Sequence, residues 1–250
     1  MKICYLLLIA LILLSSCTKD YNPYYTEPPK EGVPRVVLAE LMSATWCKNC
    51  PIADAALISL LHEMGANKLS VVIYHPTSQG DTYGTAETND RISSYYGEGD
   101  VFPVCYMDGL IKNYGGDDST LGKYRDAFNT RYALLSPFSL SLTGGIDQKS
   151  VTANIQAVAD PGTTTVTVRF VLVEGNITYD HGGEMVTEFY MARDILADEV
   201  IVVSKGYIGN IQRQFDISKS WNASNMGILV FIQRDDTKEI MQSGFIGRAF

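Results

Sequence analysis

The pattern of hydrophobic and polar positions changes near residue 137. Before that point, short apolar runs of strand length alternate with stretches in which apolar residues recur every three or four positions, as is typical of helices. This alternation predicts an α/β domain over residues 35–136. The expected strands are 36–42, 69–74 and 101–107, and the expected helices are 51–64, 86–96 and 119–135.

From residue 137 onward, apolar residues alternate with polar ones, which is typical of half-buried strands. In one of these runs Val166, Val168 and Phe170 share a face, with Thr167 and Arg169 opposite. Further short runs cover 200–203, 227–233 and 239–245, separated by turn residues. Several strands at this spacing predict an all-β sandwich of immunoglobulin type over residues 137–250, although the usual Cys-Trp-Cys core of that fold is absent.

Residues 1–16 have the features of a lipoprotein signal peptide. Lys2 is followed by an apolar run over 3–14, which is shorter than the ~20 residues a membrane-spanning helix needs. The sequence Leu14-Ser15-Ser16-Cys17 resembles the lipobox of bacterial lipoproteins, in which the cysteine becomes the lipidated first residue. The alternative is an ordinary secretory signal with an incidental cysteine. Residues 17–34, rich in Tyr, Pro, Lys and Glu, predict a flexible tether.

Charge and composition narrow the partners. The chain has 28 Asp and Glu residues against 20 Lys and Arg, a net charge of −8, which argues against nucleic acid as a partner. Any hold on a membrane would come from lipid on Cys17 rather than from charge. We therefore expect a lipid-anchored protein of the cell envelope, at the outer membrane and facing the periplasm or the cell surface.

The chemistry is concentrated in Trp46-Cys47-Lys48-Asn49-Cys50-Pro51, between an expected strand and an expected helix. The thiolate is the reactive form of cysteine, and a helix N-terminus lowers the pKa of a thiol. Cys47 is therefore the candidate catalytic nucleophile. Cys50, two residues further on, can resolve a mixed disulfide. This predicts a redox-active disulfide that needs no other cofactor, with protein thiols or disulfides of the envelope as partners.

The order of strand, Trp-Cys-x-x-Cys-Pro, helix, strand and helix, followed by Phe102-Pro103, resembles the thioredoxin superfamily over residues 35–135. In that superfamily the later proline follows a cis peptide bond, lies beside the cysteines and helps to hold an extended substrate. The resemblance implies these roles for Pro103, and Trp46 would contact substrate beside the cysteines.

A narrower resemblance covers nearly the whole chain. It is to a family of outer-membrane lipoproteins of Gram-negative anaerobes, named after an outer-membrane protein of twenty-eight kilodaltons. The matching positions are Cys17, Glu40, Cys47 to Pro51, His75, Phe102-Pro103-Val104, Ala192-Arg193-Asp194-Ile195-Leu196 and Gly206.

Three more residues are candidates for proton transfer or thiolate stabilisation. Lys48 stands where thioredoxins have glycine, and its charge should favour the thiolate. Glu40 lies one residue before the position of the buried acid of thioredoxins, which would place it on the wrong face of the strand unless the loop is longer. The alternative role for Glu40 is a structural acid. His75, at a strand end, either stabilises the Cys47 thiolate or is satisfied by backbone groups.

The remaining expectations concern the third thiol, metal binding and a rival function. The third thiol of the expected mature chain, Cys105, is interpreted as a small buried apolar residue. A structural zinc would need four ligands, and neither a second Cys-x-x-Cys nor a His pair is present, so we expect no metal. The rival function is a non-enzymatic outer-membrane or surface lipoprotein, a binding or scaffold module in which the Cys47–Cys50 bond is a structural clip.

Overall fold

The computed structural model describes residues 31–99 and 101–247. The expected signal peptide, Cys17 and most of the expected tether lie outside the described residues. The end of that tether is bound to the body of the protein. Val33 and Ser136 form an isolated antiparallel bridge in which each N–H donates to the other's carbonyl oxygen at 2.9 Å. The folded part therefore begins slightly before residue 35.

One large sheet contains strands from both halves of the chain. In chain order its strands are β1 (Val37–Met42), β2 (Leu69–Tyr74), β3 (Val104–Met107), β4 (Ile111–Tyr114), β7 (Thr164–Glu174), β10 (Met191–Ile195), β11 (Glu199–Val203), β13 (Met226–Gln233) and β14 (Ile240–Gly247). Their order in space is β14-β13-β7-β10-β2-β1-β3-β4, and β11 also pairs with β7. The two halves of the sheet meet where β10 runs parallel to β2.

The remaining elements surround this sheet. A second sheet is formed by β5 (Phe138–Gly145), β6 (Ser150–Ala157) and β12 (Ile208–Gln214), and a separate hairpin by β8 (Ile177–His181) and β9 (Glu184–Glu188). The helices are α1 (Cys50–Met64), α2 (Ala86–Asp90) and α3 (Thr120–Tyr132), with a π-helical turn η2 (Arg91–Tyr95) and short 3-10 turns η1 (Ser78–Gly80) and η3 (Ala223–Asn225).

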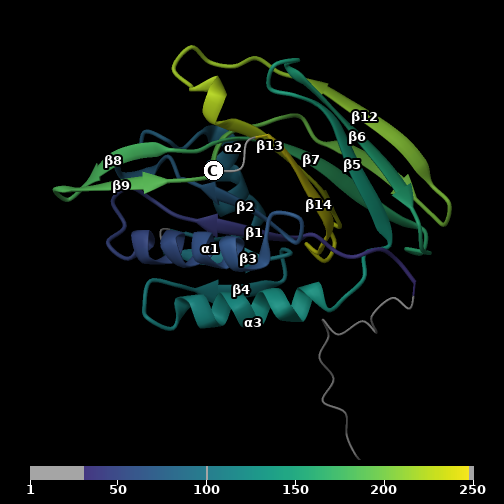
Figure 1. Cartoon of the computed structure of the whole chain (residues 1–250), viewed down its shortest axis with the longest axis horizontal. Helices are drawn as coiled ribbons and strands as arrows, with labels where there is room; N and C mark the ends of the chain where they lie inside the picture. Colours follow the sequence, from purple (N-terminus) through teal and green to yellow (C-terminus); the bar gives the residue numbers. More distant parts are fainter. Residues whose placement is uncertain (1–30, 100, 248–250) are drawn as a thin grey trace, which may run out of the picture.

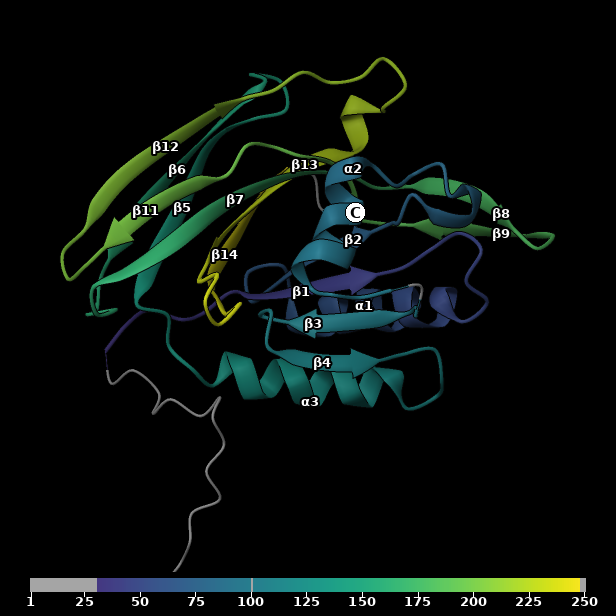
Figure 2. The same ribbon diagram turned by 180° about the vertical axis from the view of Figure 1, so that it is seen from behind.

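Helices cover both faces of the β1–β4 end of the sheet. In Figure 1, α1 lies in front of β1 and β3, and α3 lies below β4; α2 is seen best from behind, in Figure 2. Pro51 lies in the first turn of α1, where its missing N–H is not needed, and Gly65 ends the helix at a φ of 87°. Leu57, Leu60 and Leu61 bury the sheet-facing side of α1.

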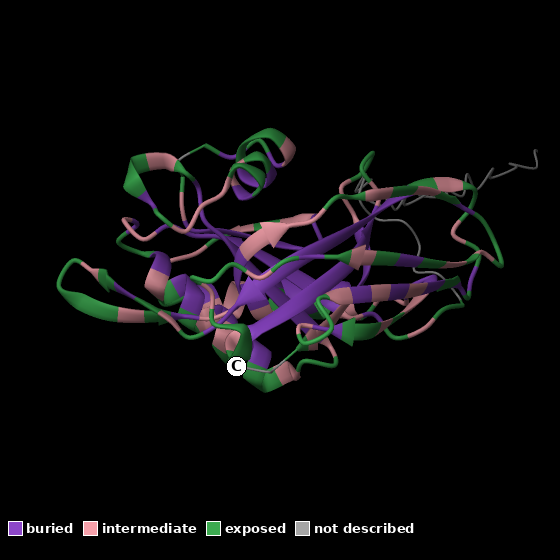
Figure 3. Ribbon diagram, turned by 90° about the horizontal axis from the view of Figure 1, so that it is seen from above, coloured by how far each residue is buried: buried purple, intermediate pink, exposed green. Residues whose placement is uncertain are grey.

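Two hydrophobic cores lie on opposite faces of β7 and β13, and β7 contributes to both. Val168 and Phe170 belong to the core shared with the second sheet, whereas Val171 and Val173 belong to the core under the helices. β13 is divided in the same way. Figure 3 shows these central strands as buried along their length. A strand buried on both faces is apolar throughout, as in sheets covered on both sides.

The two segments expected as separate domains therefore do not form separate sheets. Because β7 and β13 need cover on both faces, the second half of the chain completes the sheet that the first half begins. The three-stranded sheet packs face to face with β7, β13 and β14 across the second core, which gives the second half a two-layered β arrangement. The thioredoxin-like and immunoglobulin-like assignments stay predictions.

Most expected elements of the first half are present within a few residues of the expected bounds. The expected helix over 86–96 is α2 followed directly by the wider turn η2. In the second half, the sequence pattern did not predict β8, β9, β10 or β12. The hairpin could have been found from Gly182-Gly183 between the alternating residues Ile177, Tyr179 and Val186.

Candidate functional site

The two cysteines of the Cys-x-x-Cys sequence form a disulfide. The Cα atoms of Cys47 and Cys50 are 5.4 Å apart. Cys50 begins α1 and is fully buried, while Cys47 lies before the helix and is 6% exposed. Between them, Lys48 and Asn49 are exposed. Cys50, rather than Cys47, therefore occupies the first helical turn.

Aromatic side chains flank the disulfide. Trp46 and Phe102 pack against the cluster of Ala44, Cys47 and Cys50, and their rings meet edge to face with centroids 5.6 Å apart. The Trp46 indole N–H donates to the Ser78 carbonyl oxygen at 3.2 Å, which fixes the ring. The structure thus brings the loop of residue 102 to the cysteines, 52 residues earlier in the chain.

Pro103 is buried beside Phe102, and the peptide bond between them is cis, as predicted. The Pro103 carbonyl oxygen accepts a hydrogen bond from the Gly115 N–H at 3.3 Å. Gly116, next in that loop, lies against Asn49, since a Cβ added there would be 2.6 Å from the Cβ of Asn49. The loop after β4 therefore supports the cysteine loop.

Glu40 is not at the disulfide. Successive residues of a strand point to opposite faces, and Glu40 faces the side opposite Ser43, whose hydroxyl meets α1. The Glu40 carboxylate is buried, accepts hydrogen bonds from the Arg91 Nε at 2.9 Å and Nη2 at 2.7 Å, and also binds the Tyr96 hydroxyl. The expectation that Glu40 serves the cysteines is therefore replaced by the structural alternative.

His75 lies at the end of β2, fully buried between two carboxylates. Its Nδ1 is 2.8 Å from an Asp81 oxygen, and its Nε2 is 3.0 Å from Glu188. Burial alone would lower the pKa of His75, but Glu188 and Asp81 raise it to about 10 through charge and hydrogen bonds. His75 is satisfied by carboxylates rather than by backbone, and is cationic at neutral pH.

The His75 cluster is connected to the cysteine loop. Asp81 accepts hydrogen bonds from the Thr45 N–H at 2.9 Å and the Tyr83 N–H at 3.0 Å. Burial raises the pKa of Asp81, but its hydrogen bond and attraction to His75 outweigh that effect and lower it. His75 therefore holds an ionised Asp81, which fixes the backbone two residues before Cys47.

Asp54 is a site residue that the sequence reasoning missed. It lies in α1 four residues after Cys50, so the two side chains share one face of the helix. Burial and the charge of Glu188 raise the pKa of Asp54 well above its ordinary range. The Ser43 hydroxyl donates to one carboxyl oxygen at 3.4 Å, and Asp54 also interacts directly with the Glu188 carboxyl group. The four-residue spacing from Cys50 could have revealed it.

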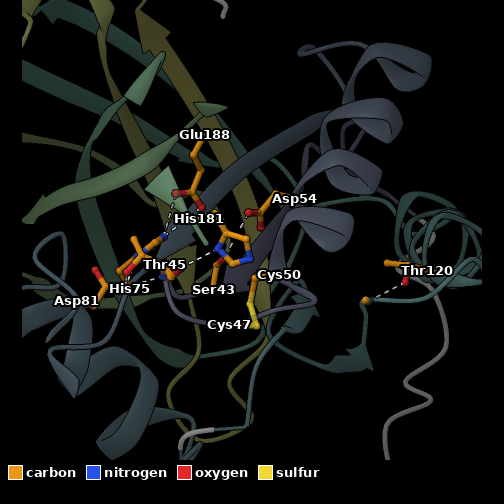
Figure 4. The surroundings of a disulfide bond; sticks show 11 residues. Ser43, Thr45, Cys47, Cys50, Asp54, His75, Asp81, Thr120, His181 and Glu188 are labelled. Atoms are coloured by element: carbon orange, nitrogen blue, oxygen red, sulfur yellow. Dashed lines mark hydrogen bonds and ion pairs between the residues drawn. A yellow bond between two sulfur atoms is a disulfide. The ribbon is translucent and has the colours of Figure 1, made fainter. Parts of the chain in front are cut away.

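The hairpin of β8 and β9 reaches the same site from the second half of the chain, as Figure 4 shows. The His181 Nδ1 is 2.8 Å from the Thr45 carbonyl oxygen, and Tyr179 packs against Tyr83. Glu188, at the base of the hairpin, lies between His75 and Asp54 (Figure 4). Sequence reasoning missed His181 and Glu188 because it did not find this hairpin.

Cys105 is a free, fully buried thiol, as predicted. Burial, and to a lesser extent the charge of Glu40, raises the pKa of Cys105 far above its ordinary value, so this thiol is unreactive. Within residues 31–99 and 101–247, no cluster of three or more His, Cys, Asp or Glu side chains is arranged to hold a metal ion. No helix of the described part is both long and apolar enough to span a bilayer.

No family model and no curated protein matches the chain in sequence. Solved structures do match the chain in their three-dimensional fold. HBP35 of Porphyromonas gingivalis aligns with 87% of this chain and 76% of its own at 13% identity and a TM-score of 0.69. Protein AGR_C_4864 from Agrobacterium tumefaciens aligns with 87% of this chain and 96% of its own at 18% identity and a TM-score of 0.60. The chain shares its overall fold with both.

A domain of the outer membrane lipoprotein Omp28 from P. gingivalis also aligns, with 45% of this chain and 88% of that domain, at 10% identity and a TM-score of 0.27. A TM-score this low does not establish a common fold. The resemblance to that lipoprotein family therefore stays a prediction. The TM-scores of HBP35 and AGR_C_4864 support a common fold, whereas their identities of 13% and 18% do not establish a common activity.

Proposed function

We propose that the protein exchanges thiols and disulfides with other proteins through Cys47 and Cys50. The observation that supports this most is Asp54, a buried carboxyl group with a raised pKa on the same helix face as Cys50. A disulfide that only clips a loop together needs no proton donor beside it. A cysteine that must leave as a thiolate, in a place closed to water, does.

In the proposed reaction, a thiolate of the partner attacks the Cys47 sulfur, the Cys47–Cys50 bond breaks, and Cys50 leaves as a thiolate. Asp54, neutral because of its raised pKa, gives its proton to Cys50. A second thiolate of the partner then attacks the partner's own sulfur in the mixed disulfide and releases Cys47 as a thiolate. Two electrons pass from the partner, which gains a disulfide, to the cysteine pair. The reverse steps would reduce a partner's disulfide.

The residues around the disulfide have roles in this proposal. The exposed charge of Lys48 favours the Cys47 thiolate. Trp46 and Phe102 offer an aromatic surface to the substrate, and the backbone before Pro103 pairs with an extended segment of it. His75 acts as a positioning residue, because it holds Asp81, which in turn binds the Thr45 N–H before Trp46.

The same proposal places the protein in the cell envelope, anchored by lipid on Cys17 at the outer membrane and facing the periplasm or the cell surface. Its first half would be a thioredoxin-like domain and its second an immunoglobulin-like sandwich, as in the lipoprotein family it resembles. Its partners would be protein thiols or disulfides rather than nucleic acid, since the chain carries a net charge of −8.

One observation favours the rival function, a binding or scaffold lipoprotein with a structural disulfide. Cys47 is only 6% exposed, so a partner thiolate can reach little of this residue unless the loop moves. A buried disulfide of this kind would resist reduction.

Reduction of insulin by dithiothreitol, followed by turbidity, separates the two functions. The wild-type chain should accelerate precipitation well above the rates of Cys47→Ser and Cys50→Ser variants. A Cys105→Ala variant serves as the matched control and should behave like wild type. Wild-type activity equal to that of the two serine variants, together with a disulfide that resists mild dithiol, would establish the structural clip instead.

A further inference from the structure

A cavity of about 520 Å³ lies on the face of the sheet opposite α1 and the disulfide, beside α2. Figure 2 shows α2 on this face. It lies where the two halves of the large sheet meet. At that junction β2 and β10 are joined by a single residue pair, Ile73 and Met191. Its lining comes from both halves, with Tyr74 and Arg91 from the first and Arg169 and Phe231 from the second. Its volume is in the range of small-molecule sites, which favour such junctions.

One of the residues that line the cavity, Arg91, has a buried donor without a hydrogen-bond partner. Arg91 is 6% exposed; its Nε and Nη2 bind Glu40, and Nη2 also binds Gln233 at 2.9 Å, but its Nη1 has no partner. The Tyr74 hydroxyl is also buried and interacts with the Glu40 carboxylate. Leaving a buried donor unpaired costs free energy, so Arg91 Nη1 favours a ligand that brings an acceptor.

The charges around the cavity are mostly negative. The Glu40 carboxylate already balances Arg91. Arg169 pairs with Asp198 at 3.3 Å and with Asp235 at 2.7 Å, so two carboxylates share one cation. The exposed acids Glu87 and Asp90 complete the rim. This excess of negative charge disfavours an anion and favours a cation at the mouth.

Between floor and rim, the walls are apolar. The lining there includes Val171, Ile195, Leu196 and Phe231. A ligand that fills the space must therefore carry an apolar body between its two polar ends.

We propose that this cavity binds a small organic cation with an apolar body and a neutral carbonyl group at the opposite end. The carbonyl oxygen accepts a hydrogen bond from Arg91 Nη1, and the cationic group lies among Glu87, Asp90 and Asp198. The site does not depend on the cysteines or on the proposed exchange reaction.

Calorimetric titration of the purified full chain with matched probes tests this. 4-(Aminomethyl)benzamide carries both the cation and the carbonyl, and should bind saturably. Benzamide lacks the cation, benzylamine lacks the carbonyl, and 4-carbamoylbenzoate replaces the cation by an anion. The first two should bind more weakly than the full probe, and the anion should not bind. Equal affinity for all four, or no saturable binding of the full probe at millimolar concentration, overturns the proposal and leaves a cavity filled by water only.

Three variants locate the binding. Asp90→Asn should weaken the full probe by about threefold, as expected for one partly exposed charge pair, and leave benzamide unchanged. Asp126→Asn removes an exposed acid on α3, across the sheet, and should change neither. Ile195→Trp should fill the cavity and abolish binding while the chain stays folded by circular dichroism. Unchanged binding in Ile195→Trp would show that the probe binds elsewhere and refute this site.

Discussion

The charge on buried His75 predicts a loss of stability as the pH rises. Its pKa is raised from 6.5 to about 10 in the folded chain, because Glu188 and Asp81 outweigh the effect of burial. In the unfolded chain the ring loses its proton near pH 6.5. A group whose folded pKa is raised contributes stability that is complete below the unfolded pKa and lost as the pH rises through the folded pKa. The window for His75 is therefore pH 6.5 to 10.

The size of the effect follows from these two values. A tenfold difference in proton affinity is worth ~1.36 kcal/mol, so the whole difference corresponds to about 5 kcal/mol. Between pH 6.5 and 9 the free energy of unfolding should fall by about 3 kcal/mol on this account.

Urea unfolding of the disulfide-intact chain at several pH values between 6 and 9.5 measures this directly. A His75→Gln variant removes the titrating ring and should flatten the dependence in this window. That variant leaves two buried carboxylates without their cation and should be less stable at every pH. If it does not fold, NMR of the wild-type imidazole nitrogens gives the same answer, since the ring should still carry both protons at pH 8. A wild-type chain that loses less than about 1 kcal/mol by pH 9, or a neutral His75 ring at pH 8, would refute the reasoning.

Two further substitutions separate catalysis from stability. Asp54→Asn should slow insulin reduction by about 100-fold, the size expected for loss of a general acid–base group, because in this direction Asp54 takes the proton from Cys50. The same variant should stabilise the fold by about 1 kcal/mol, because it removes a buried carboxyl group from beside Glu188. Unchanged kinetics would exclude Asp54 from proton transfer. Glu40→Ala should destabilise the fold without slowing exchange. Because Arg91 is left buried without its partner, we expect a loss of about 3–5 kcal/mol in urea unfolding, and no effect on exchange in the molecules that stay folded. A stability within 1 kcal/mol of wild type would show that the ion pair contributes little.

The structure also shows why half of the candidate site could be predicted and half could not. Cys47, Cys50 and Trp46 are adjacent in sequence, and the helix after them has a clear apolar period with proline at its start. Asp54 could have been added from the same helix, since a residue four positions on shares the face of Cys50. Such local relations are fixed by the geometry of one element.

His75, Asp81 and Glu188 meet through contacts between residues as far as 113 positions apart. The sequence makes His75 a candidate through its place at a strand end, but Asp81 and Glu188 are ordinary polar residues there. Only the hairpin of β8 and β9 brings Glu188 to the end of β2. The role of Glu40 also depends on a distant residue. The strand that carries Glu40 was predicted, but the ion-pair partner of Glu40 is Arg91 in η2, 51 residues later.

By itself the sequence determined the elements of the first half, the alternating strands of the second, the redox motif and the acidic balance of the chain, because these depend on residue order and period alone. Only the tertiary structure decided that both halves share one sheet, that a carboxylate-bound His75 cation lies behind the cysteine loop, and that a cavity lined by a partly unpaired Arg91 opens between the halves. The physical reason is that burial on both faces of β7 and β13, and the pairing of charges removed from water, are properties of neighbours in space, which hydrophobic period does not specify.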